Sequence, residues 1–124
     1  MHTINVLETQ QTISKWANET FGPVGSNQRV AIRANEEMAE LLRTLSIDDN
    51  DAEKAIEEVA DIFIVLYRLV DRMGGDVHAA IDKKMMINRQ RRWHLDGSGC
   101  ERHIRDKWRD EELAVIANAP GDRL

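Results

Sequence analysis

The chain has 124 residues, of which 42% are hydrophobic, 31% charged and 5% aromatic. This composition is typical of a globular protein, and the length fits a single small domain. The formal net charge of −5 argues against a general nucleic-acid-binding protein, because the affinity of such a protein depends on a basic surface.

The charge is unevenly distributed along the chain. Residues 36–61 carry ten acidic and two basic side chains, a net charge of −8. Residues 83–109 carry nine basic and three acidic side chains, a net charge of +6. The overall value therefore conceals two segments of opposite sign.

Cysteine content and hydropathy indicate the compartment. The single cysteine, Cys100, excludes an intrachain disulfide. The longest unbroken apolar run, residues 62–67, is far shorter than the ~20 residues that span a membrane. The N-terminus has neither the basic start nor the long apolar stretch of a secretory signal. We therefore expect a cytoplasmic protein that does not bind membranes.

Apolar residues recur at helical spacing in four stretches, and no alternating strand pattern is present. We expect helices over residues 6–20, 27–45, 52–73 and 76–93, and partial helix over 101–117. Asn50 and Asp76 are the expected N-caps of the third and fourth helices, and Gly74 and Gly75 are expected to end the third. Helices joined by short loops pack as antiparallel neighbours, so the sequence predicts an all-α bundle of four to five helices.

Two pairs of carboxylates are the most informative motif. Glu37 and Glu40 are three residues apart, as are Glu58 and Asp61, so each pair projects from one face of its helix. Carboxylates at this spacing are suitable ligands for a hard cation such as Mg²⁺. Two helices packed about 8–10 Å apart would bring all four side chains together.

Solvated helix glutamates are the alternative explanation of these motifs. Against this explanation, 12 of the 16 residues in the stretch 55–70 are apolar, which predicts a buried helix. Glu58 and Asp61 share a side of that helix with apolar residues, and Glu37 lies at the edge of an apolar stripe. Buried carboxylates without a partner would cost several kcal/mol, for which a cation would compensate. Glu36 points further from the core, and we expect it to be solvated.

A basic row follows on the fourth predicted helix. Lys84, Asn88 and Arg91 stand at positions i, i+4 and i+7, so they share one face. A lysine, an amide and a guanidinium in one row suit phosphate oxygens. Surface salt bridges with the acidic helices are the alternative.

Aromatic and zinc-ligand residues give weaker signals. Trp16 and Trp93 could stack on a nucleobase, although packing in the core or at a subunit interface explains them as well. His94, Cys100 and His103 form a loose set of zinc-ligand types without a second cysteine, which argues against a zinc site.

The combined motifs resemble a known family. Glu37-x-x-Glu40 followed by Glu58-x-x-Asp61 resembles the ExxE…ExxD metal motif of the MazG-like, all-α nucleoside triphosphate pyrophosphohydrolases. The later run from Lys84 through Asn88 and Arg91 to Trp93 is similar to that of short phage and bacterial members. The resemblance spans residues 16–99. It implies a MazG-like domain over residues 1–100, followed by a C-terminal extension over residues 101–124.

The resemblance implies a helical core completed in a homodimer or a dimer of dimers. It implies Mg²⁺-dependent hydrolysis of a (d)NTP to the monophosphate and pyrophosphate, with Mn²⁺ as a possible substitute. By this resemblance the metal would be held by Glu37, Glu40, Glu58 and Asp61. The phosphates would be bound by Lys84, Asn88 and Arg91, and the general base would be Glu36. Trp93 is a further substrate-binding candidate.

Two alternatives stay open at this point. One is an enzyme of the same fold that acts on dUTP, dUDP or phosphoribosyl-ATP. The other is a non-enzymatic helical adaptor whose acidic faces bind a partner. A metal site should respond to Mg²⁺ with increased thermal stability, whereas the adaptor should not.

Overall fold

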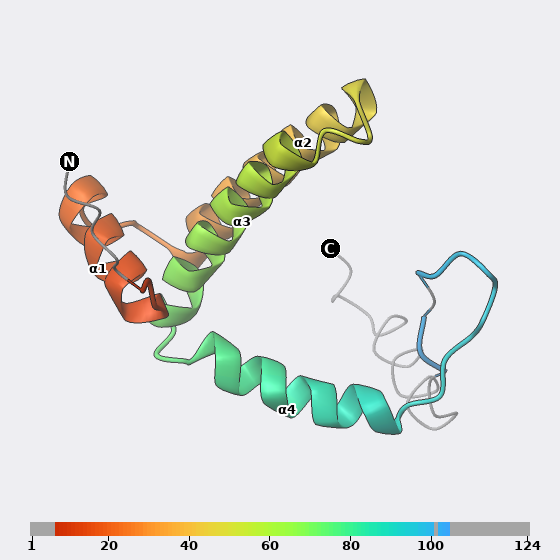
Figure 1. The fold of residues 1–124 in the computed structure, drawn as a ribbon. Coiled ribbons are helices and arrows are strands. Elements are labelled where there is room, and N and C mark those ends of the chain that lie inside the picture. Colours follow the sequence, from red (N-terminus) through yellow and green to blue (C-terminus); the bar gives the residue numbers. More distant parts are fainter. Residues whose placement is uncertain (1–6, 101, 105–124) are drawn as a thin grey trace, which may run out of the picture. The chain divides into compact units, whose positions relative to one another are not determined.

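A computed structural model describes residues 7–100 and 102–104 of the chain (Figure 1). This part contains four α-helices: α1 (Gln10–Phe21), α2 (Asn27–Ile47), α3 (Ala52–Arg72) and α4 (Val77–Gln90). The predicted all-α class is therefore confirmed. None of these helices is both long enough and apolar enough to cross a membrane.

Helix α1 begins later than the sequence pattern predicted. Its N-cap is Thr9, whose hydroxyl accepts from the backbone N–H of Thr12, while the Thr12 hydroxyl accepts from the N–H of Thr9. This reciprocal pair is a capping box in which threonine replaces the usual Glu or Gln. The expected start at residue 6 lies outside the described residues.

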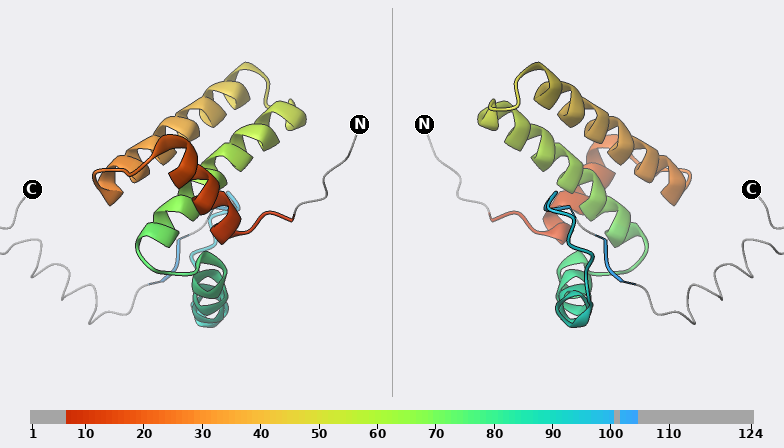
Figure 2. Two further views of the ribbon diagram at one scale, coloured as in Figure 1. Left: turned by 90° about the vertical axis from the view of Figure 1, so that its left-hand side faces the viewer. Right: turned by 90° about the vertical axis from the view of Figure 1, so that its right-hand side faces the viewer.

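Helices α2 and α3 form an antiparallel hairpin (Figures 1 and 2). Ser26 caps α2 through a hydrogen bond from the N–H of Arg29. The cap of α3 is Asp51, whose carboxylate accepts from the N–H of Lys54; the prediction of Asn50 was wrong by one residue. After α3 the chain turns at Gly74, whose φ of +74° is favourable for glycine, as the sequence predicted.

Helix α1 packs on α3 near the open end of this hairpin (Figure 2). The Ser14 hydroxyl lies 3.5 Å from the carbonyl oxygen of Tyr67. The guanidinium of Arg68 donates to the carbonyl of Gly22 at 2.7 Å and to the Asn18 side chain at 3.3 Å. These bonds hold the end of α1 against α3.

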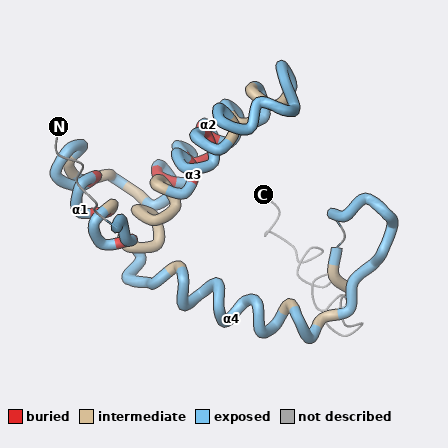
Figure 3. The backbone as a smooth tube through the Cα atoms, in the orientation of Figure 1, coloured by how far each residue is buried: buried red, intermediate tan, exposed pale blue. Residues whose placement is uncertain are grey.

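The core of the described part is small, and half of its members are polar (Figure 3). The buried apolar residues are Ala17, Val30, Ala34 and Ile62, and the buried polar residues are Gln10, Ser14, Glu37 and Glu58. The expectation that α3 would be buried on nearly all sides does not hold in the single chain, because Ile56 and Phe63 are 66% and 56% exposed. Helix α3 thus buries one face and leaves a second apolar face open.

The start of α4 is fixed by two side chains. The buried Gln10 amide donates to the carbonyl of Gly75 at 2.7 Å and accepts from the N–H of Val77 at 2.8 Å. The Asp76 carboxylate accepts from the N–H of Ala79 at 2.9 Å, which confirms the predicted cap. Both groups satisfy polar backbone atoms at the turn between α3 and α4.

Helix α4 ends at Gln90, before the predicted end at residue 93. Trp93 instead forms an isolated antiparallel bridge with His103, whose ring it also contacts edge-on at 5.8 Å between centroids. The chain divides into two units between Ile81 and Asp82. Apart from residues 102–104, the predicted extension over 101–124 lies outside the described residues, and the domain boundary at 100 stays a prediction.

Candidate metal and nucleotide site

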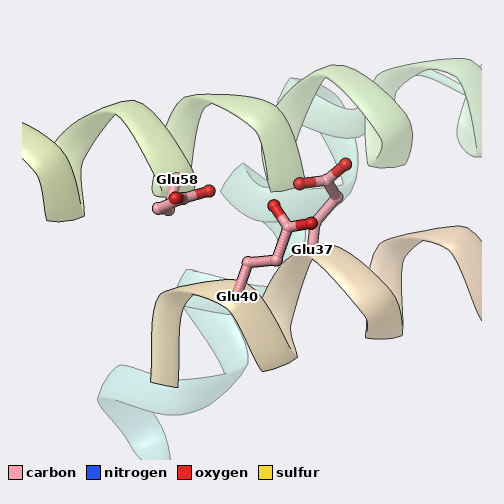
Figure 4. A group of neighbouring side chains, drawn as sticks. All are labelled: Glu37, Glu40 and Glu58. Atoms are coloured by element: carbon pink, nitrogen blue, oxygen red, sulfur yellow. The ribbon is translucent and has the colours of Figure 1, made fainter. Parts of the chain in front are cut away.

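Three of the four predicted metal ligands come together between α2 and α3 (Figure 4). Glu37 and Glu40 project from one face of α2, and Glu58 projects toward them from α3. One carboxylate oxygen of each lies within 4.8 Å of those of the other two. The three-residue spacing on α2 and the antiparallel packing of α3 together produce this convergence.

Glu37 and Glu58 are buried, with 5% and 7% of their surfaces exposed, whereas Glu40 is exposed. One carboxylate oxygen of Glu37, Oε2, is buried and has no hydrogen-bond partner among the described residues. Burial raises the pKa of the Glu37 carboxyl, the nearby Arg33 guanidinium opposes this rise, and the charges of Glu40 and Asp61 add to it. This oxygen is therefore a buried acceptor that has no hydrogen-bond donor.

Two cations that the sequence analysis missed contact these carboxylates. The Arg33 guanidinium contacts Oε1 of Glu37, and Lys54 Nζ lies 3.4 Å from Oε1 of Glu58. Both pairs are four residues apart on one helix, a spacing that brings side chains together. This spacing is visible in the sequence and could have identified both cations.

Asp61, the fourth predicted ligand, is exposed and lies outside the group of three. It lines a cavity of about 370 Å³ together with Glu37. The apolar lining comes from α1, α2, α3 and the α1–α2 connection: Trp16, Ala17, Phe21, Val24, Val30, Ile64 and Val65. The remaining lining residues are Arg29, Arg33 and Arg68. The lining is thus mostly apolar with five charged residues, and the sequence pattern did not reveal the cavity.

The predicted base, Glu36, is on the solvent side of the site. Its side chain is 58% exposed, and its Oε2 accepts from Nη1 of Arg33 at 2.9 Å. The predicted solvation of Glu36 is confirmed. Arg33 therefore contacts two adjacent carboxylates, and the hydrogen bond with Glu36 is the main cause of its raised pKa.

The predicted phosphate-binding row lies in the second unit. Lys84 is exposed, whereas Asn88 and Arg91 are half-buried. Nη1 of Arg91 lies 3.3 Å from Oδ1 of Asn88, and the indole N–H of Trp93 donates to the carbonyl of Asn88 at 3.2 Å. Asn88, Arg91 and Trp93 thus form a connected set, which Lys84 does not join through any described hydrogen bond.

The residues of the first unit suit a divalent cation. All the donor atoms are carboxylate oxygens, which hard cations such as Mg²⁺ and Mn²⁺ prefer. The buried, unpaired Oε2 of Glu37 supplies the stronger argument, since such an atom is costly unless a cation or proton compensates for it. The carboxylate set therefore fits the cation that the family resemblance implies.

Comparison with known proteins identifies the family. The model of the MazG-like family matches residues 32–107, a range that contains every predicted site residue. The chain belongs to the MazG-like family. The resemblance stated from the sequence motifs is thereby confirmed.

Relatives of this MazG-like chain include a phage enzyme. The chain is 32% identical over 102 residues to a protein of cyanophage S-2L named dATP/dGTP diphosphohydrolase, and the match covers 80% of this chain and 88% of the relative. A solved structure of the cyanophage S-2L MazG-like pyrophosphohydrolase is 30% identical, with a TM-score of 0.61, and covers 77% of this chain and 93% of that one. That structure is described as bound to dGDP and three catalytic Mn²⁺ ions per active site.

Proposed function

We propose that the protein hydrolyses a nucleoside triphosphate to the monophosphate and pyrophosphate in a reaction that depends on Mg²⁺, with Mn²⁺ as a substitute. The observation that carries this proposal is the convergence of Glu37, Glu40 and Glu58 within 4.8 Å beside a cavity large enough for a small ligand. Family membership and the named activities of the relatives support it.

Glu37, Glu40 and Glu58 hold the divalent cation in this proposal, and Asp61 completes the set from the cavity wall. The cation, when bound, supplies Lewis-acid stabilisation of the charge that develops on the phosphoryl group. Glu36 accepts a proton from the water that attacks the α-phosphorus. As the new P–O bond forms, the bond to the bridging oxygen breaks and pyrophosphate leaves.

The nucleoside occupies the apolar cavity. Trp16 and Phe21 contact each other edge-to-face at 5.4 Å between ring centroids and give the cavity an aromatic wall. The buried Nε of Arg68 has no hydrogen-bond partner among the described residues, so it offers a donor to a bound ligand. An apolar wall with one or two fixed polar groups is typical of small-molecule sites.

Lys84, Asn88 and Arg91 bind the phosphate oxygens in this proposal, and Trp93 supports the substrate next to them. Charge-assisted hydrogen bonds from lysine and arginine to phosphate are stronger than neutral ones. They offset the negative charge that grows on the leaving pyrophosphate. The hydrogen bond between Arg91 and Asn88 orients the guanidinium for this role.

The assembly that we propose is a homodimer or a dimer of dimers. Ile56, Val59 and Phe63 follow one another at helical spacing on α3 and are 66%, 36% and 56% exposed. An exposed apolar stripe of this kind marks an interaction surface. A second copy of the chain would cover it and enlarge a core that is small in the single chain. The cytoplasmic location and the lack of general nucleic-acid binding stay predictions.

A nucleotide panel tests the proposed reaction. The full-length protein with Mg²⁺ or Mn²⁺ is offered dATP, dGTP, the other dNTPs and NTPs, dUTP, dUDP and phosphoribosyl-ATP, and pyrophosphate and phosphate are measured separately. Pyrophosphate release from a dNTP or NTP supports the proposal. Cleavage of dUTP, dUDP or phosphoribosyl-ATP alone would indicate the alternative substrates. No turnover and no change in melting temperature with metal would favour the adaptor.

A further inference from the structure

The carboxylate cluster has two cations of its own in this structure. Arg33 and Lys54 each contact the Oε1 oxygen of a buried glutamate, Glu37 and Glu58 respectively. The glutamate side chains are 7% and 9% exposed, whereas those of Arg33 and Lys54 are 54% and 56% exposed. The positive groups thus approach buried carboxylates from the solvent side.

These contacts compete with metal binding. A carboxylate oxygen that accepts from a guanidinium or ammonium group uses one of its lone pairs for that donor, and this lone pair is then not available to a metal. A divalent cation at short range also repels both positive groups. We propose that Arg33 and Lys54 are the resident counter-ions of the metal site, and that a divalent cation displaces them from Glu37 and Glu58 when it binds.

Displacement of Arg33 and Lys54 should require little free energy. More than half of each cationic side chain already faces solvent, so its charged group returns to water without a large change in hydration. Arg33 also keeps a second partner, because its Nη1 donates to Glu36 at 2.9 Å. Only the buried glutamates need a positive partner both without and with bound metal, and they exchange Arg33 and Lys54 for the divalent cation.

Metal binding measured without substrate tests this inference, which rests on the metal site of the proposed function. Mn²⁺ affinity is measured by calorimetry on the full-length protein and on Arg33→Gln and Lys54→Gln. Each variant loses a competitor and gains one unit of negative charge, so we expect about three- to fivefold tighter Mn²⁺ binding, by analogy with the strength of partly exposed ion pairs.

Lys15→Gln is the matched control. Lys15 and Glu19 form an exposed i,i+4 pair at 3.9 Å on α1, so this variant changes the net charge equally without touching the cluster. We expect its Mn²⁺ affinity to stay within about twofold of the wild type. Equal or weaker binding in both Arg33→Gln and Lys54→Gln would overturn the inference. Absence of Mn²⁺ binding by the wild type would instead overturn the proposed metal site. If Arg33→Gln does not fold, Lys54→Gln decides alone.

Discussion

The side-chain amide of Gln10 joins the first turn of α1 to the first residue of α4, with its Oε1 accepting from the N–H of Val77 at 2.8 Å. Its Nε2 donates to the carbonyl of Gly75 at 2.7 Å. Gln10 is only 4% exposed, and both of its hydrogen bonds are part-buried. The side chain therefore fixes the turn between α3 and α4 to α1.

Replacement of Gln10 should destabilise the protein. Gln10→Ala removes two part-buried hydrogen bonds, each of which contributes about 0.5–1.5 kcal/mol. Urea unfolding should show a lower free energy of unfolding than in the wild type. The neighbouring Gln11 is exposed, so Gln11→Ala is the control and should change stability by less than about 0.5 kcal/mol. Equal effects of the two variants would argue against the bridging role of Gln10.

Loss of a buried carboxylate should abolish activity without unfolding the chain. Glu58→Gln keeps the size of the side chain but removes a charge, and we expect pyrophosphate release to fall on the order of 100-fold or more. Circular dichroism checks that the helices are retained. Glu57→Gln is the control, because Glu57 is adjacent and exposed. Asp61→Asn tests the fourth ligand in the same assay, and full activity there would remove Asp61 from the metal site.

The raised pKa of Glu37 should make metal-free stability depend on pH. Burial favours the neutral carboxyl, so the folded chain binds this proton more tightly than the unfolded chain does. The contribution of Glu37 to the free energy of unfolding therefore increases as the pH falls through its folded-state pKa, and is lost as the pH rises again.

Comparison with Glu37→Gln isolates this effect. With EDTA present, we compare the free energy of unfolding of the variant with that of the wild type. The variant's advantage should be greatest near neutral pH. It should shrink as the solution is acidified, because Glu37 of the wild type takes up a proton whereas the glutamine does not titrate. Thermal unfolding at several pH values measures the difference. A difference that grows on acidification would contradict the cause that we assign to the pKa rise.

Lys84 should act on substrate binding. Its neighbour Lys83 has the same charge and is also exposed, which offers a matched pair. Lys84→Ala should raise KM by about tenfold, because the loss of one charge-assisted hydrogen bond to the substrate weakens binding by roughly that factor. Lys83→Ala should leave KM nearly unchanged. Steady-state kinetics with the best substrate of the nucleotide panel measures both. Unchanged KM and kcat in Lys84→Ala would count against a phosphate-binding role.

The apolar stripe on α3 should control assembly. Phe63→Glu places a charge where a second copy would bury an aromatic ring, so we expect the dissociation constant of the dimer to rise on the order of 100-fold. Analytical ultracentrifugation over a range of concentrations measures this constant. Leu7→Glu is the control at a residue that is 91% exposed and precedes α1. A monomeric wild type would remove the proposed dimer.

Local signals in the sequence predicted much of the fold. Apolar spacing and the glycines after α3 placed the helices within a few residues, and Asp76 was identified as a cap. The errors have local causes: Thr9 and Thr12 form an unusual capping box, and Trp93 leaves the helix to pair with His103, a partner ten residues further along the chain.

The candidate site was predictable where it depends on one helix and its neighbour. The spacing within each carboxylate pair predicted the convergence of Glu37, Glu40 and Glu58. The cavity beside them was not predictable, because its lining needs α1 placed against α3 through contacts such as that of Arg68 with Gly22. The exposure of Phe63 also escaped prediction, since composition alone cannot show how many neighbours a helix has within one chain.

Glu37 and Glu58 stand on opposite arms of a hairpin whose arms are already joined at both ends. The loop over residues 48–51 connects them at one end, and Arg72 donates to the Asn27 side chain at 3.1 Å near the other. A cation held by both glutamates would fasten the arms at a third point, between these two. Bound metal would then restrict the separation of α2 from α3, so that their backbone amides would exchange hydrogen more slowly even in a protein that cannot turn over substrate.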